Sequence, residues 1–336
     1  MDPTIKDVAR LSKVSIATVS RILNNKPGYS EETKDRVMKA IEELGYQPNG
    51  VARGLISKRT RTIGILVPEL SSMVASEVIK GIEDVSHQNG SSVIVCNTDS
   101  NGKRTMEYLK LLSEKRVDGV IFASETLKKE YYKTLSEMRV PVVLLSTLSI
   151  DYQLPYIKVD DFQAAYKAVQ YLIENGHEKI AMISGNKEDP IAGEPRIAGY
   201  KKALYDNGII FREEWFVGFD AYNFENGYKG MTTLEDRKTG VTAIFASSDE
   251  LAAGVLSRAY ELGIIVPEQL SVIGYDNTKL AKMVIPPLTT VEQPLYQMGC
   301  EAAEMLYEML LSGKDVSSRI LPHKIIERKT VINLKV

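Results

Sequence analysis

The sequence predicts two kinds of structure in succession: an all-α N-terminal unit, then an α/β core built from two doubly wound parallel sheets. Residues 1–60 carry helix-capping signals and no strand pattern, whereas from Thr62 onward short apolar runs alternate with helical stretches. The chain has 336 residues, 44% of them hydrophobic and 26% charged, which suffices for two or three domains with sizeable cores. This composition excludes a disordered, collagen-like or low-complexity chain.

The first two predicted helices follow each other closely. Thr4 and Asp7 have the spacing of a capping box at the start of a helix over residues 5–11. Ser15 caps a second helix over residues 16–24 after a link of only a few residues. The apolar side of this second helix consists of Val19, Ile22 and Leu23. Two short helices joined by a tight turn indicate a helix-turn-helix unit.

A third predicted helix braces the first two. It begins at Ser30, has two glutamates in its first turn, and ends before Gly45, where a left-handed stop is expected. Its expected buried face consists of Val37, Met38, Ile41 and Leu44.

The segment that follows this unit predicts a conditional helix. Pro48 ends the third helix, and Asn49 has the side chain to cap a new one. That helix is about two turns long and contains Gly50 and Gly54, each of which costs about 1 kcal/mol relative to alanine. Helices this short are marginal in water, so we expect it to form only when something packs on it.

Apolar runs in the remaining chain predict buried strands. They lie at residues 62–68, 91–97, 117–123, 141–146, 179–184, 241–246 and 270–275. Buried strands separated by helices indicate parallel sheets covered on both faces. The chain from Thr62 onward is too long for one such sheet, so we expect two. Because doubly wound sheets bind ligands at the carboxyl ends of their strands, we expect a ligand cleft between two lobes.

Charge is unevenly distributed along the chain. The whole chain has a formal net charge of −2, yet residues 1–60 contain 11 Lys and Arg against 7 Asp and Glu, a balance of +4. A basic N-terminal unit on an acidic core predicts an anionic partner, such as nucleic acid, for that unit alone.

Several classes of protein are excluded. Cys96 and Cys300 are too few and too far apart for a disulfide scaffold or a zinc site. The N-terminus is charged where a signal peptide is apolar, and no run reaches the roughly 18 apolar residues of a membrane span. The three histidines are scattered, and no Walker or G-x-G-x-x-G motif occurs. We therefore expect a cytoplasmic, non-enzymatic protein with no catalytic residue, metal or cofactor and no membrane partner.

The chain resembles, over essentially its whole length, the lactose-repressor (LacI/GalR) family of bacterial transcription regulators. The motifs of this resemblance are IKDVA (5–9), VSIATVSR (14–21), GYQPN (45–49), ARGL (52–55), VDG (117–119), RIAGY (196–200), SDE (248–250), GYDN (274–277) and PPLTTV (286–291). The pattern is closest to the catabolite control protein branch.

The resemblance implies a domain organisation. A helix-turn-helix DNA-binding head spans residues 1–47, a hinge helix and linker residues 48–61, and a two-lobed core like that of periplasmic binding proteins residues 62–336. Lobe one takes about 62–159 and 293–320, and lobe two about 160–292 and 321–332. The family binds operators as homodimers, and strong discrimination between sites requires two heads on a pseudo-palindrome.

The resemblance also implies which residues contact the double-stranded DNA operator. In the second helix, Ile16, Ala17 and Arg21 face base edges, where an arginine fork matches guanine. Thr18 and Ser20 face phosphates, and Ser15 stands at the helix start. In the hinge, Leu55 enters the minor groove between central base pairs. The other implied hinge residues are Asn49, Ala52 and Arg53.

A small-molecule effector, most simply a sugar or sugar derivative, is implied for the cleft. Its implied ligands are a basic residue, two carboxylates, a stacking aromatic ring and a hydroxyl: Arg196, Asp160, Asp276, Tyr222 and Ser248. The resemblance alone does not give the sign of regulation.

Three departures from the family pattern bear on the effector. Ala75 stands where many members have an aromatic wall, and Pro190 stands where purine-responsive members have an arginine. Glu304 replaces an arginine that catabolite control proteins use toward a phosphorylated carrier protein, and a carboxylate repels phosphoserine. Two alternatives stay open: a regulator governed by a protein co-regulator, and a sugar-binding module without a DNA role.

Overall fold

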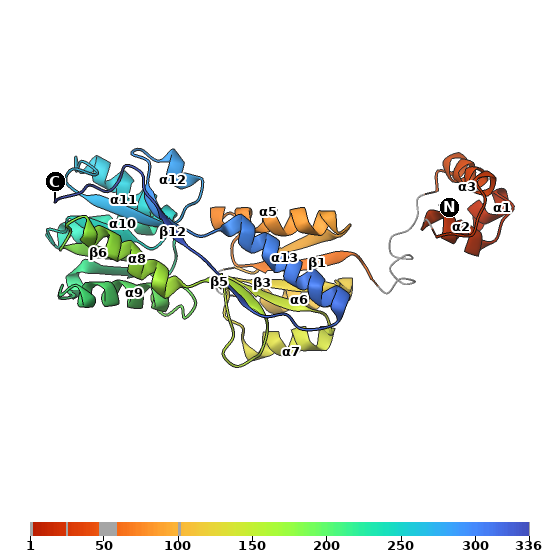
Figure 1. The fold of residues 1–336 in the computed structure, drawn as a ribbon, viewed down its shortest axis with the longest axis horizontal. Helices are drawn as coiled ribbons and strands as arrows, with labels where there is room; N and C mark the ends of the chain where they lie inside the picture. The colour runs from red at the N-terminus through yellow and green to blue at the C-terminus, as the bar shows by residue number, and fades with distance from the viewer. Residues whose placement is uncertain (1–2, 25, 47–58, 100–101, 336) are drawn as a thin grey trace. The chain divides into compact units, whose positions relative to one another are not determined.

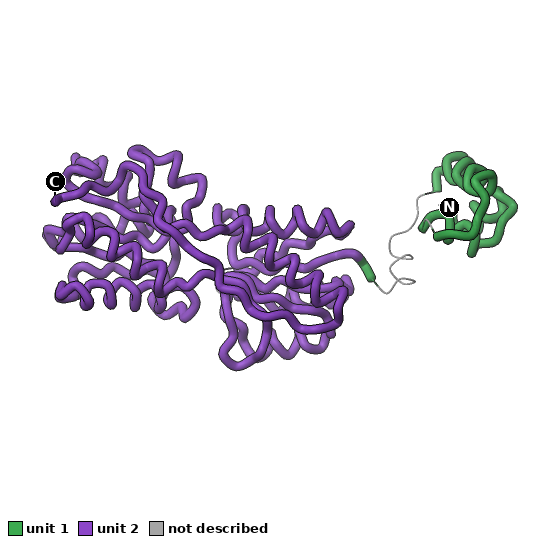
Figure 2. Tube along the Cα trace, viewed as in Figure 1, with its two compact units in different colours: residues 1–60 green, residues 61–336 purple. Residues whose placement is uncertain are grey.

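The computed structural model describes residues 3–24, 26–46, 59–99 and 102–335. They belong to two compact units, Met1–Thr60 and Arg61–Val336 (Figure 2). No helix in these described ranges is long and apolar enough to cross a membrane.

The described part of the N-terminal unit folds into the three helices that the capping signals predict. They are α1 (Ile5–Leu11), α2 (Ile16–Leu23) and α3 (Glu31–Leu44). The Ser15 hydroxyl accepts a hydrogen bond from the Thr18 backbone N–H at 3.1 Å and thereby begins α2. Gly45 ends α3 in the left-handed conformation, with φ of 61°.

The core of this unit lies where the three helices meet. It is formed by Val8, Ala9, Val19, Ile22, Val37 and Ala40. The expectation that Met38 belongs to this face was wrong, because its side chain is 49% exposed. Successive helix residues are about 100° apart, so Met38 projects well away from the stripe that Val37 shares with Ala40 and Ile41.

The second unit contains two six-stranded sheets. The first has the order β11-β5-β4-β3-β1-β2, and all its strands are parallel. Its strands are β1 (Thr62–Val67), β2 (Ser92–Asn97), β3 (Gly119–Ala123), β4 (Val142–Leu145), β5 (Tyr156–Val159) and β11 (Arg319–Leu321). Helices α5 (Met73–Gln88) and α13 (Leu295–Ser312) cover one face, and α6 (Thr105–Lys115) and α7 (Lys129–Met138) the other.

The second sheet has the order β12-β10-β9-β8-β6-β7, with only β12 antiparallel to its neighbour among the described pairs. Its strands are β6 (Ile180–Asn186), β7 (Phe216–Phe219), β8 (Ala243–Ala246), β9 (Ser271–Asp276), β10 (Thr289–Glu292) and β12 (Lys324–Ile326). Helices α8 (Asp161–Glu174) and α9 (Gly193–Asp206) cover one face, and α10 (Phe224–Asp236) and α11 (Asp249–Glu261) the other. Short helices at Glu213–Trp215 (η1) and Leu280–Met283 (α12) complete it. Each sheet with its helices is called a lobe below.

The two lobes share the chain, as Figure 1 shows. It leaves the first lobe after β5, returns to it after β10, and leaves again between β11 and β12. The two-sheet α/β architecture predicted from the alternating apolar runs is confirmed.

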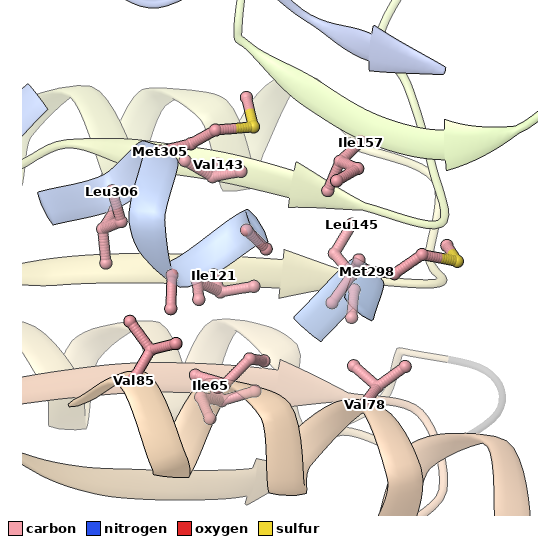
Figure 3. Close-up of a cluster of buried hydrophobic side chains, with 14 of the residues drawn as sticks. Ile65, Val78, Val85, Ile121, Val143, Leu145, Ile157, Met298, Met305 and Leu306 are labelled. Carbon is pink, nitrogen blue, oxygen red and sulfur yellow. The ribbon is translucent and has the colours of Figure 1, made fainter. Parts of the chain in front are cut away.

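The first lobe is held together by close packing of α5 on α13. A Cβ atom on Gly81 would lie 2.2 Å from the Tyr296 carbonyl oxygen, so only glycine permits this approach. Figure 3 shows side chains of both helices gathered on the sheet residues Ile65, Ile121 and Val143.

Candidate functional site

A cavity of about 460 Å³ lies at the carboxyl ends of strands from both sheets. The first lobe lines it with the segments after β1, β3 and β4, and the second lobe with the segments after β6, β7, β8 and β9. This is the edge at which parallel sheets present ligand-binding loops. The volume falls in the range of small-molecule sites, about 300–1,000 Å³.

Arg196 lies at the cavity wall inside a network of fixed partners. Its Nη2 and Nε lie 2.9 and 3.0 Å from Asp161 Oδ1, and its Nη1 donates to the Ser247 carbonyl oxygen at 2.7 Å. The guanidinium carbon stands 3.8 Å from the ring centroid of Tyr275, whose hydroxyl also donates to Asp161 at 3.0 Å. Burial disfavours the charged form of Arg196, but Tyr275 and Asp161 more than offset this and raise its pKa. The guanidinium is therefore held, charged and oriented, before any ligand arrives.

Lys158 completes this network from the first lobe. Its Nζ lies 3.3 Å from Asp161 Oδ2 and 3.5 Å from the Ile191 carbonyl oxygen. Asp161 is thus shared by both buried cations that line the cavity, Lys158 and Arg196. This one carboxylate offsets one of the two positive charges and occupies hydrogen-bond donors of both cations.

Asp276 lies at the cavity end of β9, and its side chain is only 6% exposed. Its backbone has φ of 111°, a conformation that non-glycine residues rarely adopt. Its Oδ1 accepts a hydrogen bond from Gln293 Nε2 at 2.7 Å. Burial raises the pKa of Asp276; Arg196 opposes the rise and Asp249 adds to it.

Tyr222 and Ser248 stand together on the wall of the second lobe. The Ser248 hydroxyl donates to the Tyr222 carbonyl oxygen at 3.1 Å and accepts from the Leu251 backbone N–H, so it also caps α11. The Tyr222 hydroxyl lies 3.4 Å from Asp189 Oδ2. These contacts hold the ring of Tyr222 in place where it lines the cavity.

Asp160 is not among the described residues that line the cavity. Its Oδ1 accepts from the Gln163 backbone N–H at 3.0 Å, which makes it the N-cap of α8. The neighbouring Asp161 reaches the cavity instead. The structure therefore brings Arg196, Tyr222, Ser248 and Asp276 together and leaves Asp160 outside.

Asp249 is a buried carboxylate in the SDE motif. No role was predicted for it from the sequence. Its Oδ2 accepts from the backbone N–H and hydroxyl of Thr278 at 2.7 and 3.0 Å, and its Oδ1 accepts from Thr290 at 2.6 Å. Burial raises its pKa, which these hydrogen bonds oppose. These contacts join the turn after β9 to the start of α11. Asp276 is the last residue of β9 and directly precedes this turn.

Glu125 is a cavity carboxylate of the first lobe that sequence reasoning missed. Its Oε2 accepts from Thr105 at 2.9 Å and from Thr98 at 3.3 Å. A Cβ atom on Gly102 would lie 2.2 Å from its Oε1, so the glycine makes room for this carboxylate. Burial raises the pKa of Glu125 against these hydrogen bonds. Its place directly after the apolar strand 117–123 was the available signal.

The cavity wall is strongly acidic. Among its described lining residues there are nine carboxylates, Glu69, Glu125, Asp161, Glu188, Asp189, Asp220, Asp249, Glu250 and Asp276, and three cations, Lys128, Lys158 and Arg196. Of the departures noted in the sequence, Ala75 and Pro190 also line it, whereas Glu304 is exposed on α13.

A second candidate site is the exposed face of α2. Val19 and Ile22 are buried against the other helices, and the opposite side presents the residues implied for DNA contact. Ile16 is 45% exposed, which is unusual for a large apolar side chain. Ser15, Ala17 and Arg21 are also exposed, and Thr18 and Ser20 are half-buried. The implied hinge residues Asn49, Ala52, Arg53 and Leu55 lie outside the described residues.

Metal chemistry has no candidate in the described ranges, where no group of three or more His, Cys, Asp or Glu side chains could hold an ion. Cys96 is buried, and burial raises its pKa to about 11.

Comparison with known proteins identifies both units. Residues 4–49 match the family model described as bacterial regulatory proteins, lacI family, and residues 169–331 match that of a periplasmic binding protein-like domain. The chain is 40% identical over 332 residues to catabolite control protein A of Priestia megaterium, covering 98% of this chain and 99% of that protein.

Solved structures share the fold over nearly the whole chain. The lac repressor dimer bound to operator and the anti-inducer ONPF has a TM-score of 0.87 at 27% identity, covering 99% of this chain and 100% of that one. The transcriptional regulator CelR in complex with cellobiose has a TM-score of 0.74 at 30% identity, covering 98% and 99%.

Proposed function

We propose a function from the premise that this chain belongs to the lacI family of bacterial regulatory proteins, which are DNA-binding regulators of transcription. The protein binds a pseudo-palindromic operator as a homodimer and is controlled by a sugar-class effector in the cavity between its lobes. The observation that carries the effector assignment is the convergence of Arg196, Asp276, Tyr222 and Ser248 on one cavity. We also propose that the protein acts in the cytoplasm, where its operator DNA lies, and that it catalyses no reaction.

The exposed face of α2 supports the DNA-reading role. Its N-terminal turn presents Ile16 and Ala17, and Arg21 projects from the next turn. A helix of this length fits the major groove, where an arginine fork matches guanine O6 and N7. Ile16 and Ala17 have only apolar contacts to offer, which suits thymine methyl groups.

The hinge is assigned from the family resemblance alone. Leu55 would enter the minor groove at the centre of the operator, and Asn49 would cap the hinge helix that carries it. Ala52 and Arg53 would lie in the same DNA-contacting segment. Two such helices, one from each protomer, would widen the groove together.

The cavity chemistry supports a sugar. Sugars offer several hydroxyl groups and a C–H face, and the cavity offers carboxylate acceptors, a fixed guanidinium and the aromatic ring of Tyr222. The similarity to CelR, whose structure holds cellobiose, supports the same class. An effector that prefers one arrangement of the lobes shifts the population of that arrangement and thereby changes DNA affinity.

Thermal unfolding against a panel of sugars, sugar phosphates and nucleobases tests the effector assignment. A ligand at about 100 times its Kd adds about 2.7 kcal/mol of stability, which raises Tm by roughly 2–4 °C for lobes of this size. We expect a sugar to stabilise the wild-type protein and to lose this effect in Asp276→Ala. Stabilisation by a nucleobase alone, or by no small molecule at millimolar concentration, contradicts the assignment.

One alternative has a specific observation in its favour. The chain is similar over its whole length to catabolite control protein A, the branch for which the sequence implies a phosphorylated protein co-regulator. Glu304 on α13 opposes this alternative, because an exposed carboxylate repels a phosphoserine. Operator binding that responds to a phosphorylated carrier protein and to no sugar would favour it.

A further inference from the structure

We propose that the effector is an uncharged or amine-bearing sugar, and that Glu125 is the residue of the first lobe that selects it against phosphorylated and acidic sugars. This inference rests on the proposed function, because it specifies the class of ligand that the same cavity accepts. It follows from how the charged side chains around the cavity are partnered.

The cations of the cavity are committed to protein partners. Lys158 and Arg196 both bond Asp161, and Arg196 also donates to a backbone carbonyl. An anionic ligand group would have to compete with a buried carboxylate for either of them. A site can reject one ligand through an unfavourable interaction with it, and not only by binding another ligand more tightly.

Lys128 is the remaining cation among the described lining residues. Its Nζ lies 5.3 Å from the ring centroid of Tyr131, and its side chain is exposed. An exposed lysine at the rim is screened by water and salt, so it compensates little of the negative charge within.

Acidic side chains outnumber the cations by nine to three among those lining residues. Burial raises the pKa of Glu125, Asp249, Glu250 and Asp276 and so reduces their share of the negative charge. The other five acidic side chains alone still outnumber the three cations. A phosphate or carboxylate on the ligand would enter a cavity whose electrostatic field repels it. Hydroxyl and ammonium groups donate hydrogen bonds to carboxylates and experience no such repulsion.

Glu125 presents an acceptor of this kind on the first-lobe side. Its partners in the structure are hydroxyl groups that donate to it, chiefly Thr98 and Thr105, and no cation of the described residues forms a salt bridge with it. A carboxylate has about four acceptor positions. The three hydroxyl donors Thr98, Thr105 and Tyr131 leave at least one of them for a ligand donor.

Asp276 presents the matching acceptor on the second-lobe side. Gln293 occupies one of its oxygens, and the residue lines the cavity. A ligand with hydrogen-bond donors at both ends would bridge Glu125 and Asp276, and so would connect the two lobes. Selection by charge then depends on Glu125, and the response of the lobes depends on the bridge between Glu125 and Asp276.

Isothermal titration of the full-length protein tests this with matched sugars: a hexose found to bind, its 2-amino derivative, its 6-phosphate and its uronic acid. We expect the hexose or its amino derivative to bind at least about 10-fold tighter than the phosphate and the uronate. Added salt should reduce this ratio, because the repulsion is electrostatic.

Glu125→Gln provides the residue-level test, with Glu130→Gln on the exposed surface of α7 as the matched control. We expect Glu125→Gln to weaken binding of the amino sugar by about 10-fold and binding of the neutral sugar by less. It should also reduce the difference in affinity between the neutral sugar and the phosphate. Glu130→Gln should leave all four affinities unchanged. Circular dichroism checks the fold, and the uncharged variant Glu125→Ala replaces the glutamine variant if that variant is misfolded.

The outcomes separate this inference from the proposed function. Binding of the phosphate or uronate as tightly as the neutral sugar overturns the charge selection and leaves a sugar effector in place. Equal losses for all four ligands in Glu125→Gln overturn the role of Glu125 as the selecting residue. Absence of binding by every sugar, whatever its charge, overturns the sugar effector itself.

Discussion

Arg196 and Asp161 form a buried ion pair, with Nη2 and Oδ1 2.9 Å apart, at the wall of the interlobe cavity. Asp161 begins α8 and Arg196 lies on α9, so the pair joins two helices that pack side by side on the second sheet. A cavity cation is thereby positioned by the fold and not by a ligand.

Asp161→Ala should destabilise the protein far more than Asp160→Ala, although the residues are neighbours. Removing Asp161 leaves the buried guanidinium of Arg196 without its counter-charge, which costs about 3–5 kcal/mol. Removing Asp160 deletes only the N-cap of α8, which costs about 1 kcal/mol. Urea unfolding followed by circular dichroism measures both. Equal losses of unfolding free energy in the two variants would show that the Asp161–Arg196 pair contributes no more to stability than the helix cap.

Asp276→Asn should alter the pH dependence of stability. The pKa of Asp276 is raised in the folded protein, so wild-type stability is greatest below the ordinary carboxyl pKa and falls as pH rises through the folded pKa. Asparagine stays neutral, so the variant should gain stability relative to the wild type on going from pH 5 to pH 8, by at most about 1.4 kcal/mol for each pH unit between the two measurements. Urea unfolding at the two pH values measures the difference. A wild-type protein that gains stability over this pH range relative to the variant contradicts the sign.

Arg21→Ala should weaken specific DNA binding and relax the sequence preference at the base pair it contacts. Loss of a bidentate contact to guanine costs about 1–3 kcal/mol. Lys39→Ala, an exposed lysine on α3, is the matched control and should leave base preference unchanged. Binding to duplexes varied at single positions, at fixed salt, separates the two effects. If both variants lose affinity uniformly across sequences, Arg21 contacts only the backbone.

Leu55→Ala should weaken binding to the operator much more than binding to unrelated DNA. The leucine is proposed to enter the minor groove only at the kinked centre of the specific site, whereas nonspecific binding depends on phosphate contacts. Competition titrations with the two kinds of duplex give the ratio. Equal losses on both duplexes would remove Leu55 from the specific complex.

The N-terminal helices were predictable to within about one residue because their ends are encoded locally. Ser15 and Gly45 supply the start of α2 and the end of α3 through their own side-chain and backbone chemistry. Met38 was misassigned because an apolar side chain one residue outside the stripe looks like part of it in a linear reading.

Seven strands were predictable as apolar runs, but β5, β7, β10, β11 and β12 were not. Each of these five is short and contains a charged residue or a glycine, so no continuous apolar run marks it. The equally short β4 and β8 are apolar throughout. The exchange of chain between lobes depends on long-range pairing such as β11 on β5, which no local signal specifies.

The residues of the candidate site also differ in how far the sequence predicts them. Arg196 and Asp276 follow recognisable motifs, and the structure brings them to one cavity. Asp160 and Asp161 are adjacent carboxylates, and only the start of α8 decides which one caps the helix and which one turns inward. Glu125 belongs to no motif of the resemblance, so only its position after β3 and its contacts reveal it.

The most direct test of the account measures DNA affinity and cavity occupancy together. A two-fold symmetric duplex selected by the protein is titrated by fluorescence anisotropy, with and without a sugar that raises Tm, for wild type and Asp276→Ala. The account predicts that the sugar changes the duplex Kd of the wild type by about 5-fold or more and that Asp276→Ala loses both the change and the Tm rise. A sugar that occupies the cavity and leaves the duplex Kd unchanged would contradict it.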